Sequence, residues 1–251
     1  MSDPSEPSGT PAGPLAANVV PLRAPLAPAE APGGLANGIA SGLAHGLPTG
    51  LSAVPPAAAP RKRPRPGERR VQILQTLASM LEQPGAERIT TAALAARLQV
   101  SEAALYRHFA SKAQMFEGLI EFIESSVFTL VNQITERESD GLAQARRITL
   151  VLLQFGEKNP GMVRVMVGDA LVFEHERLIA RMNQFFDRVE GQLRQSLRLA
   201  QATDGAALPD AQAVASGLVA LAMGRLQRYA RSGFKRPPTE HLDTVLARLA
   251  G

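Results

Sequence analysis

Apolar residues recur every three or four positions along most of this chain, and this spacing limits its fold more than any other feature. From Gly67 onward, residues such as Met115, Leu119, Ile123 and Val127 fall on one face of a helix. No stretch alternates between apolar and polar residues for long enough to indicate a strand. Aromatic residues are only 4% of the chain and tryptophan is absent, which suits a helical core of aliphatic side chains. We therefore predict an all-α fold.

The first 60 residues have a different composition. They are rich in Pro, Ala and Gly with single leucines between them, so they offer too little apolar surface to offset the entropy of ordering. We predict that residues 1–66 form a disordered extension that ends in a basic arm. The arm and the start of the next helix contain six basic residues, opposed only by Glu68: Arg61, Lys62, Arg63, Arg65, Arg69 and Arg70. Such a cluster attracts the phosphates of nucleic acid or of an anionic membrane, although a solvated linker has the same composition.

Several classes of protein are excluded by what the sequence lacks. Without cysteine there is no disulfide, thiol catalysis or cysteine–zinc site. The four histidines (His45, His108, His175 and His241) are scattered, and no phosphate-binding loop or nucleophile motif is present. Glu174, beside His175, is interpreted as part of a solvated helix face. We predict no enzyme activity, no cofactor and no metal, and a cytoplasmic protein, because no apolar stretch reaches the length of a membrane span.

Residues 90–109, TTAALAARLQVSEAALYRHF, have the pattern of a helix-turn-helix. Either Thr90 or Thr91 can cap the first short helix, and Ser101 can cap the second. A helix before this unit is expected to end at Pro84-Gly85, with its apolar face formed by Val71, Leu74, Ala78 and Leu81. A long helix follows, because Ser111 and Gln114 have the spacing of a capping box. Inward-facing residues that would fix the angle between the two short helices are Leu94, Leu98, Val100, Leu105 and Phe109.

The outward face of the second short helix carries the side chains that can read DNA. Arg107 can donate two hydrogen bonds to a guanine edge or bind a phosphate, and Ala103 can contact a thymine methyl group. Tyr106, His108 and Lys112 suit phosphates, and Lys112 also lies at a helix N-terminus that favours an anion. The predicted DNA-binding residues are Thr90, Thr91, Ser101, Glu102, Ala103, Tyr106, Arg107, His108 and Lys112. The alternative is an ordinary helical hairpin in which Tyr106 and His108 only pack.

The segment from Val100-Ser101 through Leu105-Tyr106-Arg107-His108-Phe109 to Ser111-Lys112 resembles the DNA-binding domain of TetR-type regulators. The resemblance implies a three-helix DNA-binding domain at 67–123, joined by a fourth helix to a helical dimerisation domain at 124–251. Gln99 departs from the family pattern, which usually has glycine in this turn. If the position needs a left-handed backbone, glutamine costs on the order of 1–2 kcal/mol.

Beyond the DNA-binding domain, the chain is similar to the nucleoid occlusion factors, a branch of the TetR-type family. The similar stretches include LIEFIE at 119–124, FGEKNPG at 155–161 and QFFDRVEGQLRQSLR at 184–198. The resemblance implies that the chain binds palindromic chromosomal sites in double-stranded DNA and inhibits assembly of the FtsZ ring over the nucleoid. It places the FtsZ tail beside the fourth and fifth helices. The implied contact residues are Phe122, Val151, Gln154, Lys158 and Asn159.

The C-terminal half is expected to contain helices near 142–156, 160–171, 173–201, 210–232 and 239–250. In the fourth of these, Gly217 and Gly224 lie on one face beside Leu218 and Leu221, where a partner helix can approach closely. We predict that these four residues belong to a homodimer interface, and the resemblance leaves open dimers of dimers on DNA. Tight packing within one chain is the alternative.

Two further functions remain open at this stage. One is a transcriptional repressor released by a small ligand, whose pocket would be lined by apolar side chains of the C-terminal half. The candidates are Phe155, Met162, Met166, Phe173 and Phe185, although such residues at helical spacing also form plain core. The other is a protein-binding adaptor that has lost contact with DNA.

Overall fold

The computed structural model describes residues 67–83, 88–204 and 210–249, and within these ranges the chain is helical and contains no strand. The predicted all-α class is therefore confirmed. The extension at 1–66, for which disorder was predicted, lies outside the described residues.

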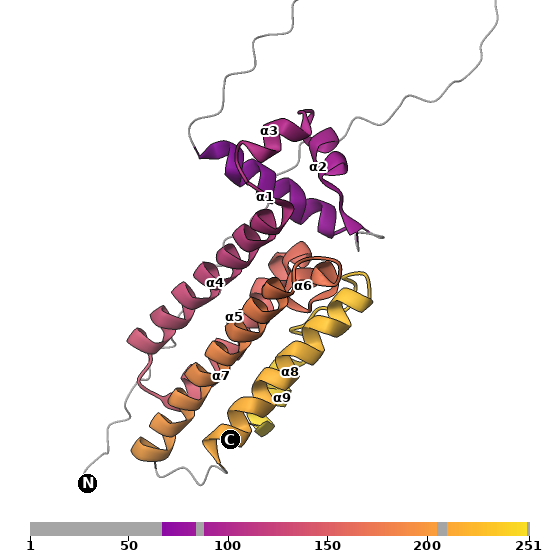
Figure 1. Ribbon diagram of the computed structural model, residues 1–251. Coiled ribbons are helices and arrows are strands. Elements are labelled where there is room, and N and C mark those ends of the chain that lie inside the picture. Colours follow the sequence, from indigo (N-terminus) through magenta and orange to yellow (C-terminus); the bar gives the residue numbers. More distant parts are fainter. Residues whose placement is uncertain (1–66, 84–87, 205–209, 250–251) are drawn as a thin grey trace, which may run out of the picture.

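Three short helices gather at one end of the molecule, and a long helix leads from them into a bundle (Figure 1). The helices are α1 (Glu68–Leu81), α2 (Thr91–Leu98), α3 (Glu102–Tyr106), α4 (Lys112–Arg137), α5 (Gly141–Lys158), α6 (Pro160–Met166), the 3-10 helix η3 (Asp169–Leu171), α7 (Glu176–Asp204), α8 (Ala211–Arg231) and α9 (Leu242–Leu249).

Helix α5 occupies the centre of the bundle, where it contacts α4, α6, α7 and α8. The sequence of α5 explains this central position. Apolar side chains occur around most of the helix, so it can pack against neighbours on several sides, and ten of its residues are buried. Buried residues of α1 and α4 belong to the same continuous apolar core as those of α5, α7 and α8. The three-helix end is thus packed onto the bundle rather than tethered to it.

The apolar face of α1 differs from the predicted one. Its buried residues are Ile73, Leu77, Ala78 and Leu81, whereas Val71 is 49% exposed. Ile73, Leu77 and Leu81 are spaced four residues apart, so these larger aliphatic side chains form one stripe that faces the core. The prediction that Val71 is in the core was wrong.

The predicted helix at 160–171 is shorter than expected. Helix α6 ends at Met166, because Gly168 adopts a left-handed backbone with φ of 85° that a regular helix does not continue through. The chain then forms η3, and α7 begins only at Glu176. Residues 172–175 are consequently a connection outside any helix, placed beside the three-helix end.

Two glycines allow helices to touch backbone to backbone. A Cβ built on Gly161 would lie 2.1 Å from the carbonyl oxygen of Ala78, so α6 and α1 are in direct contact there. A Cβ on Gly141 would lie 2.1 Å from the carbonyl oxygen of Ser196, at the contact between α5 and α7. Gly161 thus fixes how the three-helix end meets the bundle, and Gly141 fixes how two helices of the bundle pack together.

Candidate nucleic-acid interface

Helices α2 and α3 form the predicted helix-turn-helix, and side-chain caps fix where both begin. The Thr90 hydroxyl accepts a hydrogen bond from the Ala93 amide at 3.1 Å. The Ser101 hydroxyl accepts one from the Ala104 amide at 3.3 Å. Both predicted caps are confirmed.

The predicted inward residues hold the two short helices against α1 and α4. Leu94, Leu105 and Phe109 are each 1% exposed, and Leu98 and Val100 are partly buried against them. Burying one such aliphatic side chain contributes about 1.5–3 kcal/mol, so the set is ample to fix the angle between two short helices.

The turn between α2 and α3 has the left-handed geometry that glycine would favour. Gln99 has φ of 55° and ψ of 45°, and its amide donates to the carbonyl of Ala96 at 3.0 Å. The position where the family usually has glycine therefore does need a left-handed backbone. With glutamine there, Gln99 is a strained position within the motif.

The outward face of α3 is open to solvent. Ala103, Tyr106 and Arg107 are exposed, with Tyr106 at 46%, and His108 is partly exposed. Ala103, Tyr106 and Arg107 have the spacing of one helix face, opposite the buried Leu105, and Arg107 and His108 directly follow α3. This is the arrangement needed by a short helix that enters a major groove.

Two predicted contact residues bind each other in the structure. The Thr91 hydroxyl donates to the Glu102 carboxylate at 2.6 Å and so joins the first turn of α2 to the first turn of α3. This bond positions the two helices, a role that the spacing of the residues did not indicate.

Helix α1 supplies a contact that sequence reasoning missed. The Arg70 guanidinium donates to the His108 carbonyl at 2.7 Å and lies 4.2 Å above the centre of the Phe109 ring. The first turn of α1 therefore meets the residues that follow α3. The 38 positions between Arg70 and His108 gave no sequence signal for this contact.

The start of α4 has the predicted capping box in a modified form. The Ser111 hydroxyl accepts from the Gln114 amide at 3.2 Å, while the Gln114 side chain accepts from the Ala110 amide at 2.8 Å. Lys112, in the first turn, forms an ion pair with Glu174. Because the Glu174 side chain is only 11% exposed and lies outside any helix, its interpretation as part of a solvated helix face was wrong.

The predicted partner-binding residues separate into exposed and buried ones. Lys158 is exposed, and Phe122 and Gln154 are partly exposed. Val151 is 6% and Asn159 is 5% exposed, so most of their surface is unavailable to another molecule. The Asn159 amide donates to the Phe155 carbonyl at 2.9 Å, at the end of α5, and makes no side-chain cap for α6.

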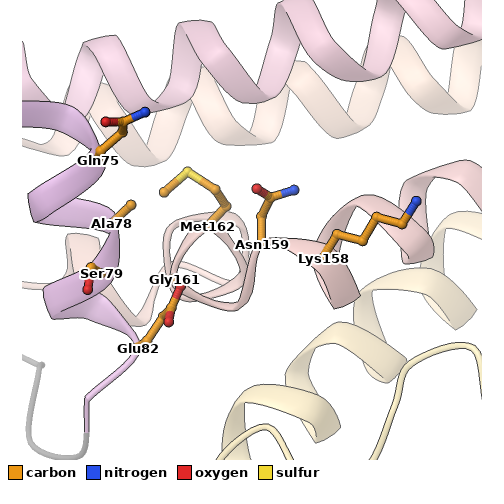
Figure 2. A pocket seen from close by; sticks show the side chains of 8 residues that line it. All are labelled: Gln75, Ala78, Ser79, Glu82, Lys158, Asn159, Gly161 and Met162. Atoms are coloured by element: carbon orange, nitrogen blue, oxygen red, sulfur yellow. The ribbon is translucent and has the colours of Figure 1, made fainter. Parts of the chain in front are cut away.

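A hollow lies where the α5–α6 junction meets α1 (Figure 2). Its cavity volume is about 20 Å³, which has room for about one water molecule, so the hollow is too small to be a ligand site as it stands. In Figure 2, Met162 lies between the junction and α1, and the Lys158 side chain extends away from α1. The lining residues are Gln75, Ala78, Ser79, Glu82, Lys158, Asn159, Gly161 and Met162.

The predicted dimer residues also fall into two groups. Gly217 and Gly224 are exposed, and a Cβ on either would meet nothing within 4 Å. Leu218 is 1% exposed and Leu221 packs partly buried against the core. The Leu218 side chain packs inside the chain, and the dimer interface at these four positions stays a prediction.

Four of the five side chains considered for a ligand pocket are core residues: Phe155, Met162, Met166 and Phe185 are at most 3% exposed, and Phe173 is 69% exposed. Over the ranges that the structure describes, no helix is long and apolar enough to cross a bilayer, and no three metal-binding side chains cluster.

Comparison with known proteins gives matches along both halves of the chain. Residues 73–119 match the family of bacterial regulatory proteins described as tetR, and residues 139–250 match a tetracyclin repressor-like C-terminal domain of SlmA-like type. The nucleoid occlusion factor SlmA of Photobacterium profundum is 52% identical over 177 residues, covering 70% of this chain and 90% of that protein. The same factor of Aliivibrio fischeri strain MJ11 is 52% identical over 188 residues, covering 74% and 96%. This chain belongs to the SlmA family of nucleoid occlusion factors.

Solved structures with much lower identity share the fold of the family. The TetR family regulator PfmR from Thermus thermophilus aligns with a TM-score of 0.61 at 19% identity, covering 71% of this chain and 97% of that one. A TetR regulator from Haloarcula marismortui aligns with a TM-score of 0.62 at 16% identity, covering 73% and 96%. The matching families are regulators and nucleoid occlusion factors, and none of them is a family of enzymes.

Proposed function

We propose that this chain binds palindromic chromosomal sites as a homodimer and, in the DNA-bound form, inhibits assembly of the FtsZ ring over the nucleoid. The observation that carries the proposal is the identity of about half of all aligned residues with SlmA proteins, extending from the helix-turn-helix through the bundle. The protein would act in the cytoplasm, associated with the nucleoid.

On the DNA side, α3 would enter the major groove with its exposed face toward the bases. Arg107 would read a guanine edge and Ala103 a thymine methyl group, while Tyr106 would contact the backbone at the groove edge. The first turn of α2 and the start of α4 would lie against phosphates on either side. The bond between Thr91 and Glu102 supports this reading, because it fixes α2 relative to α3 before DNA arrives.

On the dimer side, α8 presents a face of mostly small residues, with one methionine, that is open to solvent in the described part of the chain. The exposed positions on this face are Ala213, Ser216, Gly217, Ala220, Met223 and Gly224. Small side chains let two helix backbones approach closely, and a two-fold axis through this face would present two copies of α3 to a two-fold DNA site.

On the FtsZ side, the exposed parts of α4 and α5 would receive the partner's tail. Lys158 suits an acidic group, and Phe122 offers part of its ring, whose centre is 6.0 Å from that of Phe155. The amide oxygen of Gln154 is buried and makes no hydrogen bond within the described residues. Leaving such an acceptor unsatisfied costs about 1–3 kcal/mol, and a rotation of this partly exposed side chain would let the oxygen accept from a donor of the bound tail.

Sedimentation of purified FtsZ polymers tests the proposal. FtsZ is assembled with the protein alone, with DNA containing its site alone, and with both. The polymer pellet should shrink most when protein and DNA are present together. Arg107→Ala should lose the effect of DNA, and Lys158→Glu should keep DNA binding but lose inhibition. An unchanged pellet at every DNA concentration would favour the ligand-responsive repressor.

A further inference from the structure

The Lys112 side chain is held by a residue from the opposite half of the chain. Its ammonium forms an ion pair with Glu174, whose side chain is 11% exposed, while that of Lys112 is 26% exposed. The two residues are 62 positions apart and belong to α4 and to the connection before α7. This contact joins the three-helix end to the bundle through a residue expected to bind a phosphate.

Two groups hold the Lys112 ammonium in this state. Besides its ion pair with Glu174, the ammonium lies 5.7 Å from the centre of the Phe116 ring, one turn further along α4. A phosphate that binds Lys112 would therefore have to take the ammonium from the Glu174 carboxylate.

Other charged pairs hold the start of α7 against α4. Arg177 pairs with Glu117 at 2.8 Å. Arg181 donates two hydrogen bonds to Glu124, at 3.1 and 2.6 Å, and this bonding raises the pKa of Arg181 despite its partial burial. Since these two pairs lie further down α4, they can persist when the Lys112–Glu174 pair opens.

We propose that Glu174 is a positioning residue of the DNA interface. Its carboxylate competes with a DNA phosphate for the Lys112 ammonium. The proposal rests on the DNA binding proposed above. When Lys112 turns to a phosphate, Glu174 is left as a largely buried carboxylate without that partner, and such a charge is costly in place. Residues 172–175 therefore shift when DNA binds, and the exposed Val172 and Phe173 move with them.

The first test measures affinity for a duplex that the wild-type chain prefers. Glu174→Gln should bind it up to about fivefold more tightly, the range expected when a partly exposed ion pair no longer has to break. Glu176→Gln is the matched control, because it removes the same charge two residues away on the exposed start of α7. In the Lys112→Met background, the two glutamine variants should have equal affinities.

The second test follows the connection itself. The chain has no tryptophan, so Phe173→Trp introduces a single reporter at a side chain that is 69% exposed. Adding the duplex should change the emission of this tryptophan, and the change should disappear when Lys112→Met is combined with it.

The outcomes separate this inference from the proposed function. If the wild-type chain prefers no duplex, the proposed function fails. If it does prefer one, but Glu174→Gln and Glu176→Gln affect affinity equally, or their difference persists with Lys112→Met, the competition for Lys112 is refuted. A tryptophan signal that DNA leaves unchanged would refute the movement of residues 172–175.

Discussion

Replacing Gly161 by alanine should separate the three-helix end from the bundle. The new Cβ would lie 2.1 Å from the Ala78 carbonyl oxygen and 3.0 Å from its carbonyl carbon, both of which are backbone atoms. Because a Cβ essentially never lies closer than 3.0 Å to such an atom, α1 and α6 must move apart by about 1 Å. No flexible side-chain end is available to absorb this movement.

The free energy of unfolding should fall by about 1–3 kcal/mol, the usual cost of forcing an extra carbon into a packed contact. In a chain of this size, such a loss lowers the unfolding temperature by roughly 2–10 °C. Thermal unfolding followed by circular dichroism measures it. Gly191→Ala in α7 is the control, since its Cβ meets only the Arg194 side chain, at 4.0 Å. Alanine there should raise the free energy of unfolding by as much as about 1 kcal/mol, because it favours the helix more than glycine does. A Gly161→Ala protein that melts at or above the wild-type temperature would show that α1 and α6 are not in tight contact at this glycine.

Three other substitutions test separate parts of the structure. Gln99→Gly should raise stability by about 0.5–1 kcal/mol, because glycine relieves the left-handed backbone; a lower urea midpoint would contradict this. Arg107→Ala should weaken specific duplex binding by about 1–3 kcal/mol in fluorescence anisotropy, at an unchanged unfolding temperature, and equal affinity would exclude base reading by this residue. Met223→Glu, which places a charge on the exposed face of α8, should yield monomers in sedimentation velocity, and a dimer of unchanged mass would remove that face from the interface.

The helix-turn-helix could be predicted closely from the sequence because its signals are local. The Thr90 and Ser101 caps act within three residues, and the inward positions of Leu94, Leu105 and Phe109 follow from helical spacing. Local spacing gave the wrong result on α1, where two different apolar stripes were possible. On α1, Val71 fits a three-four pattern as well as its neighbours do, and only packing against the other helices decides which stripe is buried.

Contacts between distant segments could not be predicted in this way. The pair between Lys112 and Glu174 depends on where α6 ends, and this is set by the left-handed Gly168 and the connection after it. The bond from Arg70 to the His108 carbonyl likewise requires the folded three-helix end. Leu218 illustrates the same limit, since a leucine beside a glycine face is buried or exposed according to a rotation that sequence spacing does not specify.

Competition among genomic fragments shows whether α3 reads the sequence of a DNA duplex. The full chain is mixed with sheared chromosomal DNA at an ionic strength of about 0.15 M, where contacts to phosphates alone are much weakened, and the retained fragments are sequenced. We expect fragments that share a palindromic site to be retained, and Arg107→Ala to lose this preference. Retention of all fragments alike, or of none once the ionic strength is raised, would contradict this expectation.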